Sequence, residues 1–150
     1  MYKNSFVHYL TKILIDFMFY LGIIVCLAIP IVLPYIARLN NISTQQSMPY
    51  VIILLLLGLC SLYILWQLKA IFKTLLGGNP FIESNVKCLR KCAVASILIA
   101  LIILVDMIMS FSIASAFAFV LFGLLGLFCL TLKDVFKQAI AYKEENDWTV

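Results

Sequence analysis

The sequence predicts an all-α integral membrane protein that folds as a four-helix bundle. The chain has 150 residues, of which 65% are apolar and only 12% are charged. A soluble globular domain is about 45–50% apolar and about 25% charged, so this chain has too little polar surface to cover one. It also contains four apolar runs, each long enough to cross a bilayer, which takes about 20 residues. The composition excludes a secreted disulfide scaffold, a disordered tail and a soluble enzyme.

The four apolar runs predict membrane spans at about residues 13–33, 50–68, 93–111 and 115–132. Each span must be a helix because lipid offers no hydrogen-bond partner to an open backbone. The runs are continuously apolar, which excludes the alternating pattern of a membrane β-barrel. Residues 1–150 are therefore expected to form a single transmembrane domain.

Local residues refine the ends and faces of these spans. Pro30 and Pro34 lie near the end of the first run and favour a frayed exit turn. The last two runs nearly join through residues 110–115, which predict a tight hairpin with a serine-rich tip. Gly123 and Gly126 in the last run are small residues of the kind that let a neighbouring helix approach closely.

The distribution of basic residues predicts the orientation of the chain. Ten of the 11 Lys and Arg residues lie before the first span, in the loop 69–92 or in the tail 133–150, and only Arg38 lies elsewhere. Lys and Arg gather on the cytoplasmic side of membrane proteins. We therefore expect a multi-pass protein of the cell membrane with both termini, the loop and the tail in the cytoplasm. The net charge of +4 is then a topology signal that also attracts anionic lipid, and it requires no direct contact with nucleic acid.

No combination of residues predicts catalysis, a metal site or a cofactor. The chain has five cysteines and one histidine. Cys88 and Cys92 lie four residues apart, but a zinc site would need two further ligands, and His8 is distant in sequence. Gly77 and Gly78 are two glycines at a turn and do not form a phosphate-binding loop. We expect a non-enzymatic protein with no catalytic residue, no metal and no cofactor.

Two carboxylates lie within the predicted spans, where a charged group is costly and often marks a functional site. Asp16 is near the cytoplasmic end of its span, one turn after Lys12, and the two are expected to form an interfacial ion pair. Asp106 is in the outer half of the third span and is expected to meet Arg38 or Ser110. These three residues would form an intramembrane polar lock; the alternative is a proton or cation relay.

The loop after the second span is expected to contain a defined turn. The second helix should continue to about Leu76, where Gly77 or Gly78 can take the left-handed conformation that ends a helix. Asn79 followed by Pro80 resembles a cap with proline in the first turn, and the chain is expected to re-enter a helix through residues 83–86.

The tail is expected to extend the fourth helix by about three turns. One stripe of its surface is apolar and contains Val135, Phe136, Ala139 and Ile140. A contact surface for a cytosolic partner is predicted at residues Phe81, Glu83, Asn85, Arg90 and Phe136. The alternative is that Phe81 and Phe136 only pack the loop onto the tail.

Two segments resemble a known family. They are Gly78-Asn79-Pro80-Phe81 with Glu83, Asn85 and Leu89-Arg90, and the ending Glu145-Asn146-Asp147-Trp148-Thr149-Val150. With four spans in 150 residues, the chain looks like the uncharacterised bacterial membrane family named domain of unknown function 2975. The resemblance covers nearly the whole chain. It implies a short Gram-positive membrane protein, often encoded beside a small helix-turn-helix regulator, and it implies no catalytic residue, cofactor or substrate.

The expected function is that of a non-enzymatic membrane protein that tethers or signals to a cytosolic transcription regulator. Two alternatives are a small transporter or channel subunit and an immunity protein against a membrane-active peptide. The expected partners are the lipid bilayer, the cytosolic regulatory protein and a second copy of the chain.

Overall fold

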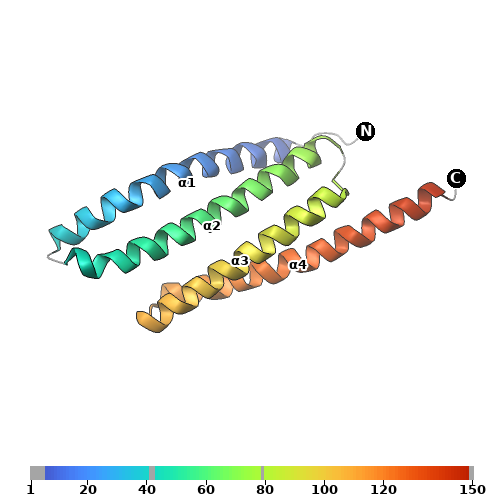
Figure 1. Ribbon diagram of the computed structural model, residues 1–150. Helices are drawn as coiled ribbons and strands as arrows, with labels where there is room; N and C mark the ends of the chain where they lie inside the picture. Colours follow the sequence, from blue (N-terminus) through green and yellow to red (C-terminus); the bar gives the residue numbers. More distant parts are fainter. Residues whose placement is uncertain (1–5, 41–42, 79, 149–150) are drawn as a thin grey trace.

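The computed structural model describes residues 6–40, 43–78 and 80–148, and within these ranges it is helical without any strand. The four helices are α1 (Phe6–Leu39), α2 (Thr44–Leu76), α3 (Glu83–Met109) and α4 (Ile113–Trp148). They run alternately up and down in chain order (Figure 1). All four are long and apolar enough to cross a membrane. The predicted class, an all-helical protein with four spans, is confirmed.

The helices are longer than the predicted spans. α4 has 36 residues and is about 54 Å long at 1.5 Å per residue, whereas the hydrocarbon core of a bilayer is about 30 Å thick. The fourth helix therefore continues well beyond its apolar run, as the amphipathic tail predicts. α1 also continues through Pro30 and Pro34 and ends at Leu39, so the predicted frayed exit turn is wrong. Proline is tolerated inside spanning helices because other groups satisfy the carbonyl that it leaves free.

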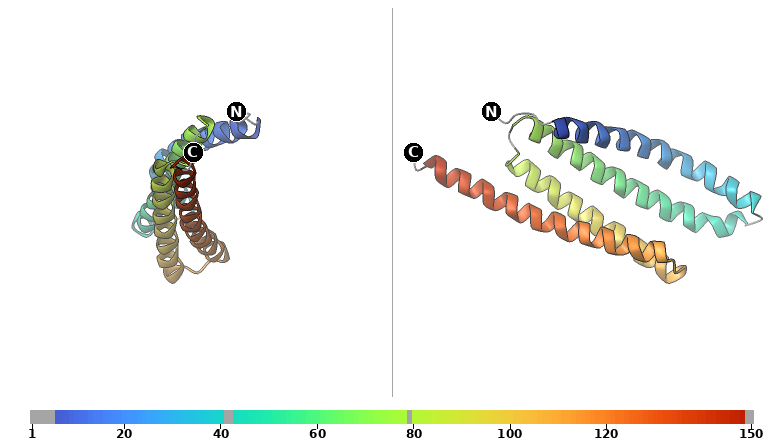
Figure 2. Two further views of the ribbon diagram at one scale, coloured as in Figure 1. Left: turned by 90° about the vertical axis from the view of Figure 1, so that its right-hand side faces the viewer. Right: turned by 180° about the vertical axis from the view of Figure 1, so that it is seen from behind.

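The helices pack in a row. In the described residues α1 packs against α2, α2 against α3, and α3 against α4, whereas α1 contacts neither α3 nor α4. Views from the front and from behind show the same order, with α1 at one side and α4 at the other (Figures 1 and 2). The bundle is therefore open, with α2 and α3 as its two inner helices.

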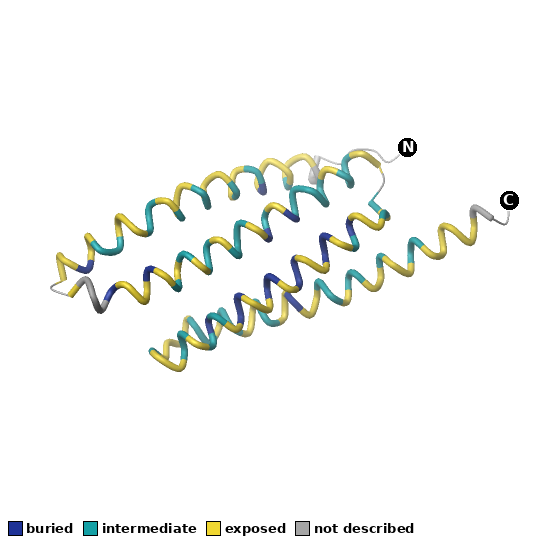
Figure 3. Tube along the Cα trace, viewed as in Figure 1, coloured by how far each residue is buried: buried dark blue, intermediate teal, exposed yellow. Residues whose placement is uncertain are grey.

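The core lies along α3, which has the most buried residues of the four helices (Figure 3). Ile99 of α3 is 1% exposed and packs in one cluster with Ile64 of α2 and with Phe119 and Phe122 of α4. Most large side chains of α1 and α4 are exposed and apolar. Such surfaces fit a protein whose surroundings are lipid rather than water.

Glycines lie where neighbouring helices pack closely. A Cβ atom at Gly126 of α4 would lie 2.8 Å from the Ile97 side chain of α3, and one at Gly58 of α2 would lie 2.5 Å from Cys26 Sγ of α1. A Cβ atom at Gly123 would meet no atom within 4 Å. Of the two glycines that the sequence marks in the fourth span, only Gly126 is at a close helix contact.

The hairpin between α3 and α4 is as short as predicted. α3 ends at Met109 and α4 begins at Ile113. The hydroxyl of Ser112 accepts a 3.3 Å hydrogen bond from Ala114 N, and the hydroxyl of Ser115 accepts one of 3.3 Å from Ser112 N while it donates one of 2.7 Å to the carbonyl of Ser112. The two hydroxyls thus satisfy N–H groups that the start of a helix would leave unpaired.

Candidate functional site

One end of the molecule carries most of its charge. At this end α1 begins, α2 ends, α3 begins and α4 extends furthest (Figure 1). The described basic residues in these segments are Lys12, Lys69, Lys73, Lys87, Arg90, Lys91, Lys133, Lys137 and Lys143. Arg38 lies in the last turn of α1, at the opposite end. We name the charged end the basic end.

The turn between α2 and α3 has a defined geometry. α2 ends at Leu76, and Gly78 has a φ of 82°, which is the left-handed conformation that glycine adopts without steric cost. α3 begins at Glu83, and its N-cap residue is Ile82. The predicted place of Pro80 in the first turn is therefore wrong, whereas the predicted re-entry into a helix at Glu83 is confirmed. Asn79 lies outside the described residues. A carboxylate in the first turn, here Glu83, is favourable because of the helix dipole.

Asn85 holds this turn together. Its side chain is buried, with the residue only 1% exposed. Its Nδ2 donates a 2.6 Å hydrogen bond to the carbonyl of Pro80, and its Oδ1 accepts one of 2.9 Å from Thr74 Oγ1 of α2. Thr74 Oγ1 is also 2.7 Å from the carbonyl of Ile71, so its one proton is shared. Asn85 thus connects the end of α2, the turn and the start of α3.

This burial corrects one predicted contact residue. Asn85 cannot present its side chain to a partner, because the side chain points into the protein and both ends of the amide are used. Glu83 and Arg90, which were predicted with it, are exposed.

Phe81 connects the turn to the extension of α4. Its ring centroid is 5.2 Å from that of Phe136, with 51° between the ring planes. Rings at this separation attract each other beyond the area that they bury. Phe81 is still 44% exposed, whereas Phe136 is half-buried. The two aromatic residues therefore meet, as the packing interpretation predicts, and one of them keeps an accessible face.

Asp16 forms its ion pair with a residue of another helix. Asp16 Oδ1 of α1 is 2.9 Å from Lys69 Nζ of α2. Lys69 Nζ is also 4.7 Å from the centre of the Phe19 ring and 5.1 Å from that of Tyr20, which are cation–π distances. The predicted pairing with Lys12 is wrong, because α2 brings a lysine that the sequence alone does not place beside α1.

The predicted polar lock is wrong as well. α1 and α3 share no contact in the described chain, since α2 lies between them, and the ion pairs found there are Asp16–Lys69 and Lys133–Asp134. Arg38 is exposed. Ser110 donates its backbone N–H and its hydroxyl to the carbonyl of Asp106, at 2.8 and 3.5 Å, rather than to the carboxylate.

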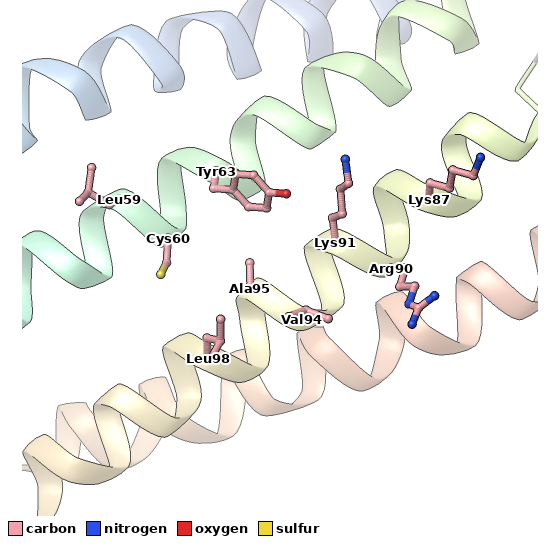
Figure 4. A pocket seen from close by; sticks show the side chains of 9 residues that line it. All are labelled: Leu59, Cys60, Tyr63, Lys87, Arg90, Lys91, Val94, Ala95 and Leu98. Atoms are coloured by element: carbon pink, nitrogen blue, oxygen red, sulfur yellow. The ribbon is translucent and has the colours of Figure 1, made fainter.

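Two grooves lie between helices. One, of about 600 Å³, is between α1 and α2 and contains the Asp16–Lys69 pair. The other, of about 570 Å³, is between α2 and α3 and is lined at one end by Lys87, Arg90 and Lys91 (Figure 4). The sequence pattern did not reveal either groove. One sequence feature could have indicated the α2–α3 groove: Lys87 and Lys91 are four residues apart, which puts both on one face of a helix.

No cluster of three or more His, Cys, Asp or Glu residues that could hold a metal ion occurs in the part of the chain that the structure describes. Cys88 and Cys92 are buried on α3 and are free thiols. Cys92 is part of the core cluster, where a thiol acts as a small apolar group.

Fold and composition together define a multi-pass, all-helical membrane protein with a structured turn at its basic end. The chain belongs to the family described as protein of unknown function (DUF2975), which matches residues 31–150. This range contains the turn, the Phe81–Phe136 contact and the α2–α3 groove, but not Asp16. Comparisons with curated proteins and with solved structures gave no match.

Proposed function

We propose that this protein is a non-enzymatic protein of the cell membrane that docks a cytosolic regulatory protein at its basic end. The observation that supports this proposal is a preformed aromatic surface at the basic end. Phe81, which is 44% exposed, packs against Phe136 of α4. Asn85 fixes the turn that presents Phe81. A rigid anchor loses little conformational entropy on binding, which favours affinity. The family resemblance supports the class of partner, since such proteins are often encoded beside a small helix-turn-helix regulator.

The proposal requires the basic end to be cytoplasmic. Nine described basic residues lie near that end and one near the other, the asymmetry by which Lys and Arg set orientation.

We expect cysteine labelling to place the two ends on opposite sides of the membrane. Both substituted positions are exposed. The Lys143→Cys variant should react with a membrane-impermeant maleimide only after the cells are permeabilised. The Asn40→Cys variant should react in intact cells. The parent chain, with its own five cysteines and no added one, gives the background. Labelling of the Lys143→Cys variant in intact cells would refute a cytoplasmic basic end.

Docking is tested by a photo-crosslinking amino acid placed at position 81 in the full chain in cells. We expect an adduct with a cytosolic protein, and we expect Phe136→Ala to reduce it about tenfold because loss of an aromatic anchor often costs more than 1 kcal/mol. The matched control is the same amino acid at Phe111, which is 74% exposed at the opposite end. Identical adducts from both positions, or none from position 81 at normal abundance, would contradict docking.

A further inference from the structure

We propose that the groove between α2 and α3 binds an anionic phospholipid, with the headgroup phosphate at Lys87 and Lys91 and an acyl chain along the apolar wall. This site is independent of the protein partner proposed above. It is argued from the shape, the polarity and the charge of the groove.

The groove is apolar along most of its length. Leu59 and Tyr63 of α2 and Val94 and Leu98 of α3 line a space of about 570 Å³ (Figure 4). The lining comes from α2 and α3 alone. Since these side chains lie within spanning helices, the molecules available to fill the groove in a membrane are lipids.

The third span is predicted to begin at about residue 93, which puts Lys87 and Lys91 at the depth of lipid headgroups. Lys87 and Lys91 come from the first turns of α3, at the basic end, and Leu98 is seven residues further into the helix than Lys91. Seven residues correspond to about 10 Å along a helix, and one leaflet of the hydrocarbon core is about 15 Å thick. A phosphate at the lysines therefore places an acyl chain beside Val94 and Leu98.

The three basic side chains at the groove point in different directions (Figure 4). Lys91 points from α3 toward α2, as Tyr63 points from α2 into the groove, and Lys87 lies one turn before Lys91. Arg90 leaves α3 on its other side. All three basic residues line this end of the groove; Lys91 points into it and Lys87 extends along α3 toward the basic end, and these two lysines would contact a phosphate placed there.

The charge of the groove is uncompensated. Its lining includes three basic residues and no acidic one, and none of the three belongs to an ion pair among the described residues. The α1–α2 groove also has three lysines in its lining, Lys12, Lys69 and Lys73, but it contains a carboxylate, Asp16, which pairs with Lys69. Basic sites between spanning helices are typical binding places for anionic headgroups, and the α2–α3 groove has basic residues and no acidic residue in its lining.

The test measures lipid binding by the purified full chain in detergent, using native mass spectrometry with phosphatidylglycerol or phosphatidylcholine. We expect phosphatidylglycerol to remain bound and phosphatidylcholine to bind more weakly. Lys87→Gln with Lys91→Gln should weaken phosphatidylglycerol binding about 25-fold, about fivefold for each lysine. Lys87→Arg with Lys91→Arg should retain it.

The matched control is Lys137→Gln with Lys143→Gln, which removes the same charge from exposed positions on α4. The proposal is overturned if this control loses as much phosphatidylglycerol as the groove variant, or if phosphatidylcholine binds equally well. Inorganic phosphate and glycerol phosphate distinguish a lipid site from a phosphate site. If either displaces the lipid at equal concentration, the apolar wall contributes nothing and the lipid proposal fails. Circular dichroism confirms that each variant is folded.

Discussion

Replacing Asn85 by Leu is expected to lower the free energy of unfolding in detergent by about 3 kcal/mol. The substitution removes two hydrogen bonds, and the Pro80 carbonyl, 2.6 Å from Asn85 Nδ2, keeps only a 3.2 Å bond from Ile82 N. Each bond contributes about 0.5–1.5 kcal/mol to stability. Asn85 is 1% exposed, so water cannot easily replace the bond. Thermal unfolding followed by circular dichroism measures the loss.

Thr74→Val is the matched control for Asn85→Leu. It removes the hydroxyl that bonds Asn85 Oδ1 at 2.9 Å but leaves the bond to Pro80. We expect a smaller loss of about 1 kcal/mol. Equal stability of the Asn85→Leu variant and the parent would show that this amide does not hold the turn.

The Asn85→Leu variant also tests whether Asn85 is needed to hold Phe81 in place, apart from its effect on stability. A released turn would move Phe81 away from Phe136, because their 5.2 Å contact depends on where the turn is held. Crosslinking from position 81 should then fall even in molecules that remain in the membrane. If it persists at full yield, the Phe81 surface forms without Asn85.

Gly126→Leu is expected to separate α3 from α4 and to destabilise the protein by about 2–3 kcal/mol. A Cβ atom at this position lies 2.8 Å from Ile97 Cγ1 and 3.4 Å from the backbone carbonyl of Ala93. The carbonyl cannot move without displacing α3, and forcing extra carbons into a packed contact typically costs about 1–3 kcal/mol. Unfolding in detergent measures the change.

Gly123→Leu is the control for this contact. It makes the same substitution one turn earlier on α4, where a Cβ atom meets nothing within 4 Å. The gain in helix propensity is the same for both variants, so the difference between them reports the helix contact. If both variants have the same stability, α3 and α4 do not pack at Gly126.

The first of the two segments that carry the family resemblance has a defined structural task in this chain. Gly78 takes the left-handed conformation, Pro80 supplies the carbonyl that Asn85 binds, and Phe81 contacts Phe136. Leu89, in the same stretch, is 5% exposed and belongs to the buried face of α3. The stretch from Gly78 to Leu89 thus builds the turn at the basic end, and Arg90, which follows it, is exposed.

The sequence by itself determined the class of protein and the course of the chain through four helices. A bilayer leaves a long apolar run no alternative to a helix, so the spans follow from composition. Local signals were also sufficient where partners are close in sequence. The helix end at Leu76, the left-handed Gly78, the serine-rich hairpin and the extension of α4 all rest on residues within a few turns of one another.

Only the tertiary structure decided which side chains meet across helices. Asp16 pairs with Lys69, and Arg38 does not meet Asp106, because α2 separates α1 from α3 in an open row. Asn85 resembles a surface residue in the sequence, yet the turn directs its amide between Thr74 and Pro80. Helical periodicity assigns a residue to a face of its own helix, but the neighbour of that face depends on how the helices are arranged, which spacing along one chain does not specify.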